Sequence, residues 1–163
     1  MSTDSENRAD ALGLRTEAAG RFEVEVGALQ SLGSMATGER RVVAITGGRA
    51  HGLLAGKILP GGADWQWVRA DGITEISAHY VVRTADGDLV EVHSDGYRHG
   101  PPEVMARLAA GEGVDPSLYY FRTTLRFATA SGRPDLARLN GLLAIGVGER
   151  RARQVVIHLH LVR

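Results

Sequence analysis

The sequence predicts an all-β fold, a small antiparallel meander β-barrel of about eight to ten strands with one short helix. Short apolar runs that alternate at period two or are rich in β-branched residues recur along the chain. Glycine-rich turns separate these runs, and the pairs Asp71-Gly72 and Asp86-Gly87 are typical of tight hairpins. Closure into a barrel is favoured because an open sheet this wide would expose its edges, and a two-sheet sandwich is the alternative.

The strand candidates are justified one by one by their alternation and by the turns that end them. Residues 22–26 alternate strictly, and residues 42–46 form a β-branched run that we expect to end at Gly47-Gly48. Residues 74–84 form the longest candidate, which the turn at Asp86-Gly87 closes. The full set in chain order is 22–26, 42–46, 53–59, 65–69, 74–84, 89–93, 119–129, 139–147 and 154–162.

One segment has helical rather than strand character. Residues 101–111 begin with two prolines, which suit a first helical turn, and end at Gly111, which suits the position after a helix. Val104 and Leu108 lie four residues apart, so this helix has one apolar side to pack on a sheet. Residues 131–135 are expected to form a loop between two strands.

Length and composition limit the possible functions. The 163 residues suit one domain, with residues 1–20 expected as a flexible N-terminal tail and 21–163 as the barrel. Nineteen basic residues balance nineteen acidic ones, so the chain lacks the basic footprint of a nucleic-acid-binding protein. The absence of cysteine excludes disulfides, thiolate metal sites and cysteine nucleophiles. No apolar run suits a membrane span or signal peptide, so we expect a cytoplasmic protein.

Several blocks of the sequence are similar, in the same order, to one bacterial family. They are Ile45-Thr46-Gly47-Gly48, Leu59-Pro60-Gly61-Gly62-Ala63-Asp64-Trp65-Gln66, Asp71-Gly72, Tyr80, Asp86-Gly87, Arg98-His99-Gly100-Pro101-Pro102-Glu103 and Tyr120-Phe121-Arg122-Thr123. Over residues 22–162 the chain resembles the domain-of-unknown-function family 3237, also called uncharacterised protein family 0311. The resemblance implies a small, self-associating antiparallel barrel without a settled activity. We expect a homodimer, in which a partner covers apolar sheet surface.

The chain departs from the family pattern at two places. The family tends to carry an acidic residue in the segment that is Phe127-Ala128-Thr129-Ala130 here, and often has Trp where Arg138 precedes Leu139. We expect Phe127 to contact the ligand. If these positions line the site, either the substrate of this chain differs from the family's typical one or the activity is absent.

The candidate catalytic residues are Asp64, Glu75, Arg98 and His99. Asp64 could act as a general base if nearby apolar groups raise its pKa, or could simply cap the preceding glycine turn. Arg98 could hold an oxyanion and His99 could transfer protons, although a pairing of Arg98 with Asp95 or Glu103 is the structural alternative. Glu75 shares one strand face with His79, and the alternation does not say which face looks inward.

The candidate ligand-binding residues are mostly aromatic. Trp65 and Trp67 share one strand face, which could be core or a ligand platform. Tyr80 could donate a hydrogen bond to a ligand carbonyl. Tyr120 and Arg122 also share a face and could bind an oxyanion together.

Metal and cofactor binding are not expected. His158 and His160 lie two residues apart on one strand, with Glu91 and His93 as possible partners, but the spacing of metal-binding barrels is missing. Phosphate-loop and dinucleotide motifs are absent from the sequence as well.

These observations predict a barrel that binds an apolar or aromatic small molecule. It could be a cofactor-free isomerase, cyclase or lyase that works by acid–base chemistry. The alternatives are a ligand-binding protein of lipocalin type without catalysis, and an oligomeric structural barrel whose interior is filled by its own side chains.

Overall fold

The computed structural model describes residues 13–163, which contain nine strands. These are β1 (Thr16–Met35), β2 (Gly38–Gly52), β3 (Gly56–Ile58), β4 (Gly62–Val68), β5 (Thr74–Thr84), β6 (Leu89–His99), β7 (Tyr120–Thr129), β8 (Ala144–Arg150) and β9 (Gln154–Val162). The α-helices are α2 (Pro102–Ala109) and the single turn α3 (Pro134–Ala137), and the 3₁₀ turns are η1 (Pro116–Leu118) and η2 (Arg138–Gly141). The structure confirms the all-β class and the helix after β6.

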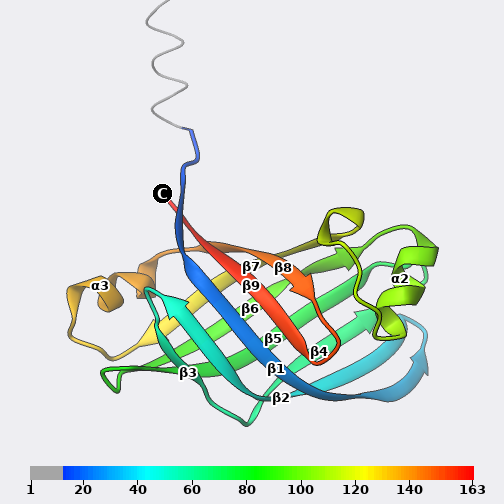
Figure 1. Ribbon diagram of the computed structural model, residues 1–163, viewed down its shortest axis with the longest axis horizontal. Coiled ribbons are helices and arrows are strands. Elements are labelled where there is room, and N and C mark those ends of the chain that lie inside the picture. The colour runs from blue at the N-terminus through cyan, green and yellow to red at the C-terminus, as the bar shows by residue number, and fades with distance from the viewer. Residues whose placement is uncertain (1–12) are drawn as a thin grey trace, which may run out of the picture.

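The strands close into a barrel-like ring in which every pairing is antiparallel. Starting from β1, the ring runs through β2, β4, β5, β6, β7, β8 and β9 and returns to β1. The short β3 joins β2 to β5 beyond the end of β4. Most ring neighbours are also neighbours in sequence, as a meander requires (Figure 1). Closure pairs the strands along the ring and so removes the exposed edges of an open sheet.

Several boundaries differ from the expected ones. β1 begins at Thr16, where it pairs with Val162 of β9, so the strand takes in the last five residues of the expected tail, and residues 1–12 lie outside the described part. β2 does not end at Gly47-Gly48 but continues to Gly52. Residues 53–59 contain only the three-residue β3, and residues 139–141 belong to a 3₁₀ turn rather than to β8.

Gly47-Gly48 bends a continuous strand instead of ending it. Both glycines have positive φ, and the pairing register between β1 and β2 shifts beside them. A Cβ at residue 48 would overlap the carbonyl of Glu23 on β1. The pair therefore forms an irregularity that lets β2 curve around the barrel, as β-bulges commonly do.

The interior has two ends of different character. Figure 1 shows α2 at one end of the barrel and α3 at the other. Near α3, inward side chains are apolar and fully buried, and Leu136 and Leu139 from α3 and η2 cover them. Near α2 the inward positions include polar residues such as Gln66, Ser94 and Thr123. We call these the apolar end and the polar end. Within residues 13–163, no helix combines the length and apolarity needed to cross a membrane.

Candidate functional site

Strand alternation on β4 divides the most specific sequence block between the two faces of the barrel wall. Asp64 and Gln66 point into the barrel, whereas Trp65 and Trp67 lie on the outer surface. Trp65 is 41% exposed, and Gln66 is 4% exposed. The two tryptophans are therefore not core residues, and they do not approach the inward carboxylate.

The polar end holds a small cavity of about 60 Å³. That volume accommodates about four waters, at ~15 Å³ of cavity volume for each. Its apolar wall comes from β1, β2, β5, β7 and β9. Its lining is Val24, Val26, Leu29, Val43, Ile45, Asp64, Gln66, Ile76, Ala78, Tyr80, Ser94, Arg98, Phe121, Thr123, Arg150, Val155 and Ile157. Leu29, the one exposed member of this lining, marks its mouth.

Asp64 is the one carboxylate of the cavity lining. Its Oδ2 accepts a hydrogen bond of 2.7 Å from Nε2 of Gln66, while its Oδ1 is shielded from solvent and has no partner among the described residues. Burial raises the pKa of Asp64, and the hydrogen bond from Gln66 and the charge of Arg98 offset only part of that effect. A carboxyl group whose pKa is raised is a stronger base than an ordinary one and is suited to accept a proton from a ligand.

The cationic groups of the cavity are Arg98 and Arg150. Burial lowers the pKa of Arg98 to about 10, and the attraction of Asp64 opposes this shift. Arg98 therefore keeps its charge at neutral pH, with its guanidinium 5.5 Å from the ring centre of Phe121. Burial lowers the pKa of Arg150 also. Two cations against one carboxylate favour a ligand that carries or develops negative charge.

Tyr80 contributes a hydroxyl group to the cavity lining. The residue is 3% exposed, and its ring packs edge-on against Phe22 at 6.2 Å between centres. Burial raises the pKa of Tyr80, so its hydroxyl stays protonated and can donate. The Oη atom has no hydrogen-bond partner among residues 13–163.

Three further buried polar atoms face this cavity without a partner in the described part of the chain. They are Oε1 of Gln66, Nε of Arg98 and Oγ1 of Thr123. Buried polar groups are normally paired, because an unpaired one costs about 1–3 kcal/mol. Groups left unpaired around one cavity are the pattern expected of a binding site that a polar ligand completes.

Sequence reasoning found Asp64, Tyr80 and Arg98 but missed Gln66, Ser94, Thr123 and Arg150. Thr123 could have been found, because it interrupts the inward apolar series Phe121, Leu125 and Phe127 on β7. Arg150 could not, since it lies beyond the expected strand 139–147, whereas β8 extends to Arg150. Its backbone N–H donates to the hydroxyl of Tyr119, 2.9 Å away, a contact that spans 31 residues.

Most of the other predicted site residues lie on the outside of the barrel. Glu75, Trp65, Trp67, Tyr120 and Arg122 border an outer groove of about 730 Å³ over β4 to β7. Arg40 of β2 lies over both tryptophan rings, 5.3 Å from the centre of Trp65 and 4.6 Å from that of Trp67. We call this surface the outer aromatic groove.

The remaining candidates are accounted for individually. Glu75 forms an ion pair of 3.4 Å with Arg69, so its side chain is engaged outside the barrel. His99 stacks on Tyr120 with ring centres 4.9 Å apart, on the face opposite to Arg98. Phe127 is buried, but it belongs to the apolar end and does not line the cavity. The structure therefore does not bring His99, Glu75 or Phe127 to Asp64.

The fold and this cavity define a closed antiparallel β-barrel with an apolar, packed end and a polar pocket at the other. The family model described as "Protein of unknown function (DUF3237)" matches residues 14–162. The chain belongs to this family, as its sequence blocks indicated.

Related bacterial proteins share both sequence and structure with the chain. A UPF0311 protein of Rhodopseudomonas palustris is 41% identical over 150 residues, which cover 91% of this chain and 97% of the relative. The crystal structure of RPA1785, a protein of unknown function from the same species, matches with a TM-score of 0.88 at 39% identity and covers 93% of this chain and 99% of its own. A β-barrel-like protein from Acinetobacter baumannii matches with a TM-score of 0.79 at 37% identity, covering 93% of this chain and 97% of its own.

A more distant neighbour is an enzyme. The crystal structure of an enzyme from Penicillium herquei matches with a TM-score of 0.65 at 18% identity, covering 90% of this chain and 94% of its own. At this identity the likeness concerns the fold alone.

Proposed function

We propose that the polar end binds a small organic molecule and carries out cofactor-free acid–base chemistry on it, as an isomerase, cyclase or lyase. The single observation that carries this proposal is the convergence of Asp64, Tyr80 and Arg98 on one cavity with unpartnered polar atoms. The enzyme nature of a neighbour with the same fold is compatible with the proposal and adds no residue role to it.

The roles follow from the chemistry of each group. Asp64, with its raised pKa, would remove a proton from a carbon or hydroxyl of the substrate and return it elsewhere. Arg98 and the hydroxyl of Tyr80 would stabilise the enolate or phenolate oxygen that this step creates. Gln66 positions the Asp64 carboxylate through its 2.7 Å hydrogen bond.

The lining also supports a proposal for the substrate class. Most of the wall is aliphatic or aromatic, so the body of the ligand is apolar, and the cationic groups select a carbonyl, phenol or carboxylate as its polar part. The outer aromatic groove contains no buried unpartnered carboxylate among residues 13–163 and is therefore the weaker candidate for catalysis.

The test is a thermal-shift and NMR screen with small enones, phenols and aromatic carboxylates. Compounds that bind the wild type should bind Asp64→Asn and Arg98→Met at least about tenfold more weakly, since each variant removes one charged partner. Trp65→Ala is the matched control, because it changes the neighbouring residue on the opposite face. Binding that tolerates Asp64→Asn and Arg98→Met but not Trp65→Ala would reject the interior site.

Turnover separates the catalytic function from its alternative. A compound that binds the wild type is incubated with it and followed by NMR for isomerisation, ring closure, elimination or hydrogen–deuterium exchange. We expect conversion by the wild type and at least about a hundredfold loss in Asp64→Asn. Binding without any conversion or exchange would assign the barrel to non-catalytic ligand binding.

A further inference from the structure

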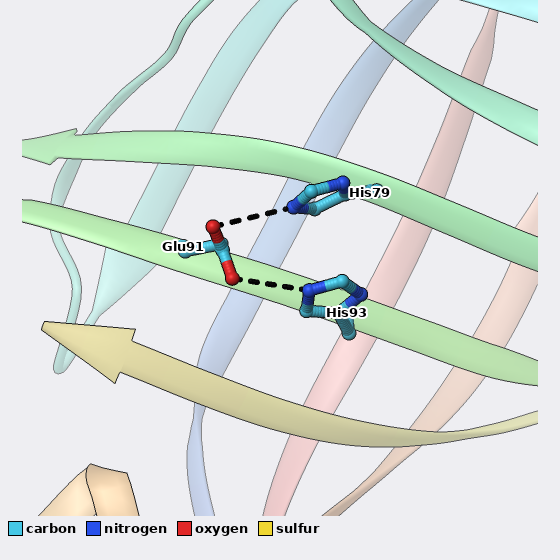
Figure 2. A group of neighbouring side chains, drawn as sticks. All are labelled: His79, Glu91 and His93. Atoms are coloured by element: carbon cyan, nitrogen blue, oxygen red, sulfur yellow. Dashed lines mark hydrogen bonds and ion pairs between the residues drawn. The ribbon is translucent and has the colours of Figure 1, made fainter.

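A second group of side chains that could bind a ligand, two imidazoles and one carboxylate, lies on the outer surface of β5 and β6. His79 of β5 and His93 of β6 are directly opposite each other in the antiparallel pairing. Glu91 precedes His93 by two residues, so its side chain is on the same outer face. Figure 2 shows the two imidazole rings and the carboxylate gathered over these neighbouring strands.

The three side chains already point toward one another. Nε2 of His93 is 3.0 Å from one Glu91 oxygen, and Nε2 of His79 is 3.5 Å from the other. The two rings are stacked with centres 3.9 Å apart and planes inclined by 17°. Both histidines therefore present the same nitrogen to one carboxylate (Figure 2).

We propose that His79, Glu91 and His93 bind one divalent transition-metal ion, with Zn²⁺ as the reference ion. Two imidazole nitrogens and one carboxylate oxygen are a set of three protein ligands that zinc accepts, with a fourth position left for water or another ligand. Metal-ligand atoms from these three residues lie within 4.8 Å of one another.

The geometry requires side-chain adjustment and no backbone movement. Zinc bonds of about 2.0–2.2 Å in a tetrahedral site place ligand atoms roughly 3.4 Å apart. The side chains of His79, Glu91 and His93 are 54%, 45% and 39% exposed, so each has room to rotate. The strand pairing holds the two histidine backbones opposite each other, which fixes the distance over which the side chains must converge.

Both signs of charge are present beside the three residues, since Arg126 lies opposite His93 in the pairing of β6 with β7 and Glu91 supplies a carboxylate. Glu91 supplies the only carboxylate among the three proposed ligands, and its oxygen atoms lie within reach of both imidazole rings. Glu91 and His93 border a surface hollow of about 380 Å³ that Arg126 and Asn140 also line. The open coordination positions thus adjoin a hollow in which water or an anion can complete the site.

This site is separate from the proposed catalytic cavity. His79 and His93 point outward, whereas their neighbours Tyr80 and Val92 point into the barrel. The sequence had offered His158 and His160 as the nucleus of a metal site with Glu91 and His93. The ring order instead places β9 between β1 and β8, and His158 lies 4.0 Å from Glu149.

The experiment is a titration of untagged, chelator-treated protein with Zn²⁺ by calorimetry and with Co²⁺ by visible absorption. We expect one ion per chain for the wild type, and at least about tenfold weaker binding for His79→Gln, His93→Gln and Glu91→Gln. The Co²⁺ spectrum should lose its ligand-field bands in the same variants. These exposed substitutions should leave the far-UV circular dichroism spectrum unchanged.

His158→Gln is the matched control, because His158 also faces a glutamate on a neighbouring strand but has no second histidine opposite it. It should bind the metal as the wild type does. Failure of the wild type to bind Zn²⁺, or equal weakening by His158→Gln and His93→Gln, would overturn the proposal. The outcome does not affect the catalytic proposal, since none of these residues lines the interior cavity.

Discussion

The two ends of the barrel interior are built from the same strands but differ in what their inward side chains do. At the apolar end, Val82, Val90, Leu125 and Leu161 are completely buried and pack in one continuous core. At the polar end, the same strands contribute Ile76, Ser94, Thr123 and Ile157 to a cavity. One face of one sheet therefore provides both a packed core and an incompletely satisfied pocket.

Strand β7 shows the difference within a single element. Its inward residues are Phe121, Thr123, Leu125 and Phe127, and only Thr123 among these four carries a side-chain hydroxyl. That hydroxyl has no partner in the part of the chain that the structure describes. The apolar end contributes stability through burial, whereas the polar end gives up some stability to keep unpaired groups available for a ligand.

The largest expected effect is a difference in the free energy of unfolding between one substitution at the apolar end and one at the polar end. Leu125→Ala removes a fully buried side chain and should lower the free energy of unfolding by about 2–5 kcal/mol. Thr123→Val, two residues away on the same face, replaces an unpartnered hydroxyl by a methyl group and should be neutral or slightly stabilising. Denaturant unfolding of both variants measures the contrast. Equal destabilisation by the two substitutions would show that Thr123 is satisfied in solution.

The next effect concerns Asp64, whose raised pKa makes stability depend on pH. The folded state holds the Asp64 proton to a higher pH than the unfolded state does, so the free energy of unfolding falls as pH rises from the unfolded pKa to the folded one. Asp64→Asn cannot titrate and should lack this fall. The stability of the variant relative to the wild type should therefore increase with pH over that window and become constant above it.

Denaturant unfolding of the wild type and Asp64→Asn between about pH 4 and pH 8 checks this prediction, with Asp95→Asn as the control. Asp95 accepts a hydrogen bond from Ser77 on the outer face, so it tests an aspartate outside the cavity. A difference between wild type and Asp64→Asn that does not change with pH would mean that burial does not raise the Asp64 pKa.

The sequence predicted the strands well where a hairpin turn or strict alternation marks them. Residues 74–84 form β5 as expected, and the helix after β6 follows from its prolines and glycine. Gly47-Gly48 was misinterpreted because a glycine pair suits both a turn and a bulge, and only the pairing with β1 distinguishes them. The extension of β1 to Thr16 depends on its pairing with β9, a contact across the whole chain that local pattern does not encode.

Only part of the candidate site could be predicted from the sequence, because a local pattern shows which residues share a face but not where that face points. Period-two alternation correctly separated Asp64 from Trp65 and Arg98 from His99, but it did not say which set faces inward. Burial of Ile76, Tyr80 and Val82 settles this for β5 and places Glu75 outside. Gln66 pairs with Asp64 within β4, two residues away on the same face. The arrival of Arg150 at the cavity depends on the closed ring, which brings β4 and β8 to the same pocket.

A smaller effect tests whether the polar end sacrifices stability for binding. Tyr80→Phe deletes a buried hydroxyl without a partner in residues 13–163 and keeps the ring that packs on Phe22. We expect the free energy of unfolding to rise by about 0.5–1.5 kcal/mol, while the affinity for a carbonyl ligand falls about tenfold. Denaturant unfolding and ligand titration measure the two quantities. A loss of stability would show that the hydroxyl is paired in solution and would weaken its role as a donor to ligand.

The smallest effect on stability is expected at the outer aromatic groove, which lies on the outside of the barrel and not at either end of its interior. Trp65→Ala removes an exposed ring and one of two cation–π contacts of Arg40, so the free energy of unfolding should change by about 1 kcal/mol or less. Ligand binding in the interior should be unaffected.

Light scattering after gel filtration measures the molar mass and so tests the homodimer that the sequence led us to expect. If two copies associate through this surface, Trp65→Ala should shift the mass toward the monomer. A dimer that is insensitive to Trp65→Ala would place the contact elsewhere and leave the groove as an isolated solvated surface.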